Sequence, residues 1–169
     1  IASGAENLSE EEQRVQALNA WRLNDADSLF ERAIQADSTF ALAYYKHALT
    51  HGWRAAGDTT QLALIAKALE HSGRLPERER DIVAAYADLV TALTAAFSAD
   101  TAKQRAAYQS AQRKYEAIVQ RDSGAVEAWY GLGDSYYHDV SQGDPAFAGK
   151  WSNALRAFDR TLALDPTFH

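Results

Sequence analysis

Two similar stretches decide the fold of this chain: ADSLFERAIQADSTF at residues 26–40 and ALRAFDRTLALDPTF at residues 154–168. Ala, Phe, Arg, Asp, Thr and Phe recur at identical offsets in the two stretches. A weaker third copy begins at Ala111, with Tyr115 and Asp122 in the corresponding places. Each copy has the apolar spacing of a helix and ends in Asp followed by Ser or Pro, and the copies that begin at Ala26 and Ala111 precede another helical stretch. Such repetition predicts helix–turn–helix units stacked in a row.

The remaining sequence is also helical in character. Good helix formers dominate, and no stretch alternates β-branched and polar residues as a strand would. Capping residues, Gly and Pro divide the chain into about eight predicted helices, the first of which opens at Ser9. The others are expected near residues 24–37, 38–56, 59–72, 76–97, 100–122, 123–138 and 147–164. Gly73 is expected in a left-handed conformation after the fourth helix, and residues 141–145 form the clearest loop.

Composition excludes several classes of protein. The chain has 169 residues, 47% of them hydrophobic, which is enough apolar content for a folded core. The absence of Cys excludes disulfides, thiolate metal sites and a thiol nucleophile. A net charge of −6 disfavours nucleic acid as a partner. No apolar run approaches the ~18 residues of a membrane span. Because the chain starts at Ile1, we expect a processed product or an excised piece.

The last unit carries a complete family signature. The pattern W-x2-L-G-x2-Y, then A-x3-F, then P is matched by Trp129, Leu132, Gly133, Tyr136, Ala154, Phe158 and Pro166. This unit therefore resembles a tetratricopeptide repeat (TPR), with a turn lengthened by the loop at residues 141–145. The earlier units match in part, and Ser38 stands where the family has Pro. The resemblance implies an all-α, right-handed α-solenoid of about four TPR-like repeats in a single array over residues 1–169. The approximate repeats are residues 8–40, 41–75, 76–125 and 126–168.

A second resemblance concerns the context of the array. The stretch LPERER at residues 75–80, followed by divergent repeats, is similar to arrays appended to bacterial signalling proteins such as serine/threonine kinases, cyclases and transcriptional regulators. It implies the repeat region of a larger signalling protein, and thus a fragment of a longer chain. Both a cytoplasmic and an extracytoplasmic location stay open.

The TPR resemblance implies a non-catalytic protein–protein interaction module. In TPR arrays the leading helix of each pair lines a concave groove, and this chain concentrates aromatic residues in two leading helices. Tyr44, Trp129 and Tyr136 occupy signature positions and are assigned to the core. Adjacent residues on a helix point about 100° apart, so their neighbours are candidates for a groove that binds a peptide or partner helix. These candidates are Tyr45, Lys46, Leu49, Trp53, Glu127, Tyr130, Asp134, Tyr137 and His138. For each of them, packing against the neighbouring repeat is the alternative.

Some TPR proteins grip a C-terminal carboxylate with Lys, Asn and Arg on successive leading helices. Here the equivalent face offers Tyr45, Leu49, Glu127 and Gly131. A carboxylate clamp of that kind is therefore not expected.

Two histidines have a spacing that can hold a metal ion. His47 and His51 lie four residues apart on one helical face. No Glu stands next to His47, so the metalloprotease motif is absent, and the repeat register places both residues on the packing side. We interpret them as packing histidines and expect no metal site, no cofactor and no catalytic residues. A metal-dependent enzyme is the weaker alternative.

The structural alternative is a spacer or self-association element of a larger signalling protein. The chain stops at Phe168 and His169, where another leading helix would begin, and a solenoid end without a capping helix exposes apolar surface. This predicts homo-oligomers formed through the exposed solenoid ends. The expected partners are thus proteins or peptides, with no nucleic acid and no membrane insertion of this segment.

Overall fold

The computed structural model describes residues 23–54, 59–96, 100–139 and 147–168, and these residues form helices and turns without any strand. The elements are α2 (Leu23–Ala36), α3 (Ala41–Arg54), α4 (Thr60–His71), the 3-10 helix η1 (Ser72–Arg74), α5 (Glu77–Ala95), α6 (Thr101–Arg121), α7 (Val126–His138) and α8 (Phe147–Leu164). These bounds confirm seven of the predicted helices to within a few residues. The predicted helix at Ser9 and the loop at residues 141–145 lie outside the described residues.

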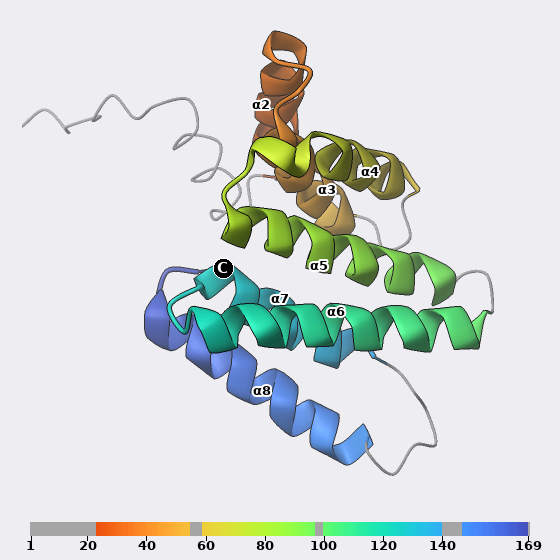
Figure 1. Cartoon of the computed structure of the whole chain (residues 1–169), viewed down its shortest axis with the longest axis vertical. Helices are drawn as coiled ribbons and strands as arrows, with labels where there is room; N and C mark the ends of the chain where they lie inside the picture. Colours follow the sequence, from red (N-terminus) through yellow and green to blue (C-terminus); the bar gives the residue numbers. More distant parts are fainter. Residues whose placement is uncertain (1–22, 55–58, 97–99, 140–146, 169) are drawn as a thin grey trace, which may run out of the picture.

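Figure 1 shows α2 at one end of the longest axis, α8 at the other end, and the remaining helices between them. The most extensive contacts join α3 with α4, α5 with α6, and α7 with α8, which are the helical hairpins expected from the repeats. The leading helix α5 also contacts the leading helix α7. The chain is therefore an all-α helical solenoid with a TPR-like arrangement. Its handedness, its division into four repeats and its place in a longer chain stay predictions.

The three sequence copies end in the same turn. Asp37, Asp122 and Asp165 each accept a hydrogen bond on Oδ1 from the backbone N–H two residues later, at 2.8, 3.0 and 2.9 Å. The N–H of the following residue then donates to the Asp carbonyl, at 3.1–3.2 Å. An Asp side chain that imitates a backbone turn in this way stops one helix and starts the next. The repeated Asp in the sequence thus corresponds to a repeated turn in the structure.

Small and large side chains interlock between the helices. Ala26, Ala48, Ala111 and Ala154 are buried, as the close approach of paired helices requires. Gly133 of α7 lies against α8, where an added Cβ would stand 2.6 Å from Phe158 Cε1. The large side chains of Phe30, Tyr115 and Leu132 are buried between the helices. Small side chains thus let the helices approach each other, and large ones fill the space between them.

The end of α4 differs from the prediction. Gly73 does not adopt a positive φ, and it lies within η1. Ser72 donates its hydroxyl to the carbonyl of Leu69 at 2.8 Å, and the N–H of Leu75 donates to the carbonyl of Ser72 at 2.9 Å. The expectation of a left-handed helix end was wrong because a 3-10 turn with a serine cap satisfies these groups instead.

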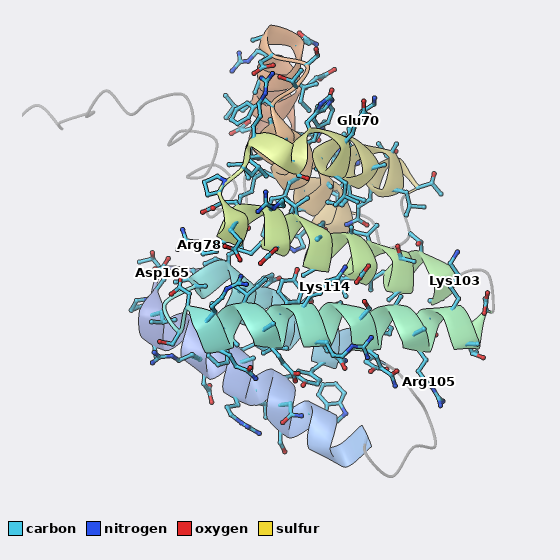
Figure 2. All side chains as sticks on the ribbon, in the orientation of Figure 1. Glu70, Arg78, Lys103, Arg105, Lys114 and Asp165 are labelled. Carbon is cyan, nitrogen blue, oxygen red and sulfur yellow. The ribbon has the colours of Figure 1, made fainter. Side chains whose placement is uncertain are left out.

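Ion pairs on the surface link α5 to the end and middle of α6 (Figure 2). Arg78 pairs with Asp122 at 3.1 Å, and Lys114 pairs with Asp88 at 2.7 Å. Exposed pairs of this kind contribute at most about 1 kcal/mol each, so they adjust the register of the hairpin rather than hold it together.

Candidate functional site

The leading helices α3, α5 and α7 line one cleft, which we call the aromatic cleft. Side chains of α3, α5, α6 and α7 form it, together with Phe168 after α8. Its lining residues are Tyr45, Lys46, Leu49, Trp53, Tyr86, Leu89, Tyr115, Glu127, Tyr130, Gly131, Asp134 and Phe168. The cleft is narrow, since these side chains leave room for about one water molecule.

Three buried tyrosines form the floor of the aromatic cleft. Tyr45, Tyr86 and Tyr115 are each at most 5% exposed. The rings of Tyr45 and Tyr86 meet edge to face at 5.3 Å, and the Tyr45 hydroxyl donates to Glu127 Oε1 at 2.7 Å. Burial raises the pKa of all three phenols, so they stay protonated. Tyr115 lies so close to Gly131 that no larger residue fits there without movement.

Tyr130 stands at the centre of an aromatic cluster at the wall of the cleft. Its ring centroid lies 6.2 Å from Trp53 of α3, 5.9 Å from Phe158 of α8 and 5.1 Å from Phe168. These separations lie within the range of favourable aromatic pairs. The position of Phe168 shows that the cleft accepts an aromatic ring beside Tyr130.

Charged groups are also present in the cleft. Lys46 of α3 forms a close ion pair with Glu127 of α7, and its ammonium lies 5.2 Å from the Tyr45 ring centroid. Asp134 lies 3.3 Å from His138, one turn later on α7, and its hydrogen bond raises the pKa of His138. Two carboxylates and one ammonium line the aromatic cleft, so it carries a negative balance.

The structure brings together seven of the nine predicted groove residues: Tyr45, Lys46, Leu49, Trp53, Glu127, Tyr130 and Asp134. It does not bring Tyr137 or His138 into the cleft. Tyr137 lies about 10 Å further along α7 than Tyr130, at 1.5 Å per residue. Its ring is 47% exposed and meets Trp151 of α8 edge to face at 5.3 Å.

Sequence reasoning missed five lining residues as members of the groove: Tyr86, Leu89, Tyr115, Gly131 and Phe168. Tyr86 and Leu89 lie on α5, a leading helix whose sequence lacks the TPR signature. The sequence identified Tyr115 only as a repeated position of the third copy. Apolar residues stand three and four positions on either side of Tyr86, which marks a buried helix face. This spacing does not show that the face lines a cleft.

A second group of polar side chains lies between α2 and α3. His47 and His51 face α2, as the repeat register predicts, and both approach Asp27. These are the only three His, Asp or Glu side chains in the described residues that gather closely enough to share a metal ion.

The fold and the cleft define an all-α helical solenoid in which α3, α5 and α7 converge on an aromatic cleft. Among solved structures, the chain is similar to the crystal structure of YrrB, a TPR protein with an unusual peptide-binding site. The TM-score is 0.38 with 16% identity, over 90% of this chain and 83% of that one. No family model and no curated protein matches the chain. None of the described helices is long and apolar enough to cross a bilayer.

Proposed function

We propose that this chain is a non-catalytic protein-interaction module that binds a peptide or partner helix in the aromatic cleft. The observation that carries the proposal is the convergence of Tyr45, Trp53 and Tyr130 from two leading helices on one cleft. Aromatic rings supply large contact areas at a low cost in side-chain entropy, and they dominate the binding energy of many interfaces. Glu127 Oε1 is engaged by both Lys46 and Tyr45, which supports a structural role for this carboxylate rather than acid–base chemistry.

The cleft favours a particular ligand chemistry. An aromatic or large aliphatic side chain of the ligand takes the place that Phe168 occupies beside Tyr130. The narrow cleft has no separate space for it, so Phe168 moves aside. A basic residue next to this side chain is attracted by Asp134 and Glu127, which outnumber Lys46. The preferred peptide thus combines an aromatic anchor with Lys or Arg.

The test is a selection of peptides from a random display library on the immobilised protein, followed by fluorescence anisotropy with labelled selected peptides. We expect Trp53→Ala and Tyr130→Ala each to weaken binding at least about tenfold, as for buried aromatic anchors. Tyr137→Ala is the matched control, because this ring is exposed and lies outside the cleft. Circular dichroism verifies that each variant is folded. Peptides that bind the Trp53 and Tyr130 variants as tightly as the wild type would refute the proposal.

A second candidate function, self-association, is supported by α8. Trp151, Leu155 and Leu162 are 45%, 62% and 50% exposed, and Trp151 and Leu155 are one turn apart. Large apolar side chains exposed together mark interaction surfaces. Light scattering should show a mass that increases with concentration, and the double variant Leu155→Lys, Leu162→Lys should remain monomeric. A wild-type chain that is monomeric at high concentration excludes this candidate.

A further inference from the structure

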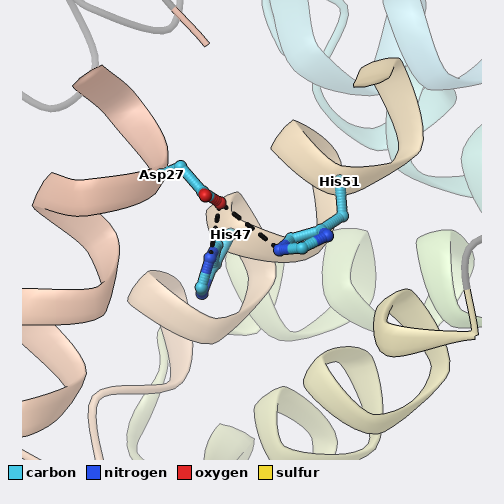
Figure 3. A group of neighbouring side chains, drawn as sticks. All are labelled: Asp27, His47 and His51. Carbon is cyan, nitrogen blue, oxygen red and sulfur yellow. Dashed lines mark hydrogen bonds and ion pairs between the residues drawn. The ribbon is translucent and has the colours of Figure 1, made fainter. Parts of the chain in front are cut away.

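Asp27, His47 and His51 bring three potential metal ligands to one point between α2 and α3 (Figure 3). His47 Nε2 lies 2.8 Å from Asp27 Oδ1, and His51 Nε2 lies 3.3 Å from the same oxygen. One ligand atom from each residue lies within 4.8 Å of the other two. The two imidazole nitrogens therefore converge on a single carboxylate oxygen from the neighbouring helix.

This geometry is close to that of a bound transition metal. Zinc–nitrogen and zinc–oxygen bonds are about 2.0–2.2 Å long, so ligand atoms around a tetrahedral ion stand about 3.3 Å apart. The His51–Asp27 distance already has this value. The His47–Asp27 distance must increase by about 0.5 Å, which a small rotation of the carboxylate provides. Two imidazoles and one carboxylate suit Zn²⁺ and the neighbouring divalent ions.

The surroundings hold the ligands in place while leaving access. Arg54 Nη1 donates to Asp27 Oδ2 at 2.8 Å, which fixes the carboxylate with Oδ1 toward the imidazoles. The side chains of Asp27, His47 and His51 are 27%, 12% and 19% exposed, so an ion can enter from solvent. An outer hydrogen bond of this kind orients a ligand in many metal sites.

One feature lowers the expected affinity. His47 Nδ1 is buried and has no hydrogen-bond partner among the residues that the structure describes. When Nε2 binds a metal, the ring proton lies on Nδ1, where metal-ligating histidines normally donate to a carboxylate or carbonyl. The loss of such a partner typically weakens metal binding by about 10–100-fold. The affinity for the metal ion is therefore expected to be lower than that of a site whose histidines all have such partners.

We propose that Asp27, His47 and His51 form a site for a divalent first-row transition metal ion, represented by Zn²⁺, which links α2 to α3. The fourth position is taken by water from the solvent side. The ion replaces the direct contacts of the two imidazoles with Asp27 and attaches α2 more firmly to α3. None of these three residues lines the aromatic cleft.

The experiment is titration of the metal-free chain with Zn²⁺ by isothermal calorimetry and with Co²⁺ by visible absorption. We expect one ion per chain, a cobalt spectrum of low symmetry, and a melting temperature that Zn²⁺ raises and a chelator restores. His51→Gln and Asp27→Asn should each weaken binding at least about tenfold. His138→Gln is the control, because this histidine lies beside a carboxylate on α7 and outside the proposed site.

Two results would overturn the proposal. The first is no Zn²⁺ binding up to millimolar concentration by a chain whose circular dichroism shows it to be folded. The second is binding that His51→Gln leaves unchanged, which would place the ion elsewhere. If Asp27→Asn unfolds α2, His51→Gln decides the question, because it removes one ligand while the contact between His47 and Asp27 remains.

Discussion

Gly133→Ala tests the close approach of α7 and α8 on which the repeat packing depends. In an open helical position, replacement of Gly by Ala stabilises a protein by up to about 1 kcal/mol, because it restricts the unfolded chain. At Gly133 the new Cβ would stand 2.6 Å from Phe158 Cε1 and 2.7 Å from Cδ1. Real Cβ atoms do not approach a ring that closely, so Phe158 or the helix must move.

The free-energy cost of that movement decides whether Gly133→Ala stabilises or destabilises the fold. Overpacking a core costs about 1–3 kcal/mol, which exceeds the gain in helix propensity. We therefore expect Gly133→Ala to lower the free energy of unfolding by about 1–2 kcal/mol, or the melting temperature by roughly 2–8 °C. Urea unfolding followed by circular dichroism measures it. Gly149→Ala on α8 is the matched control, since no atom of the described residues lies within 4 Å of its added Cβ, and it should be neutral or stabilising.

A second substitution, Phe158→Leu, tests whether the Phe158 ring causes the destabilisation by Gly133→Ala. If contact with Phe158 is responsible, Phe158→Leu should reduce the penalty of Gly133→Ala in a double-mutant cycle. A Gly133→Ala variant as stable as the Gly149→Ala variant would refute the close approach and the TPR-like packing inferred from it. Equal penalties for Gly133→Ala with and without Phe158 would place the strain elsewhere.

Three further predictions concern stability. Phe30→Ala should lower the free energy of unfolding by about 3–5 kcal/mol in urea titrations, because this fully buried ring leaves a cavity. Asp122→Ala should cost about 1 kcal/mol by the same assay, whereas Asp122→Asn, which retains the turn acceptor, should cost less. The hydrogen bond with Asp134 raises the pKa of His138 above its ordinary 6.5. Protonated His138 therefore stabilises the folded chain fully below pH 6.5, and this stabilisation is lost as the pH rises through the pKa that His138 has in the folded state. The stability difference between wild type and His138→Gln should accordingly be larger at pH 5.5 than at pH 8, and a difference independent of pH would contradict it.

The helices could be predicted because their ends are marked by local chemistry. Asp100 illustrates this, since its side chain accepts the N–H of Lys103 at 3.0 Å at the start of α6. A capping residue acts within one turn, so its effect is visible in a short window of sequence. Gly73 shows the limit of such reasoning. Gly permits a left-handed helix end without requiring it, and the hydroxyl of Ser72 supplied another way to close α4.

Which of two adjacent aromatic residues on α3 and α7 faces the cleft could also be predicted, and the structure shows why. Tyr44 and Trp129 occupy the same repeat position, and each donates to the carbonyl six residues before it, at 3.3 and 3.0 Å. This shared anchor turns the next residue of each helix, Tyr45 or Tyr130, toward the cleft.

Residues that meet only through the tertiary fold could not be found in this way. Periodicity reports the face of one helix, and it does not report which faces of different helices converge. Tyr86 enters the aromatic cleft from α5, and Phe168 enters it after the last helix. The same limit applies to Asp27, which stands 20 residues before His47 and completes the three-ligand group from another helix. A histidine pair was visible in the sequence, but its carboxylate partner became visible only when α2 was packed against α3. Chemistry assembled across repeats therefore has to be sought in the structure, even where the fold is evident from the repeats themselves.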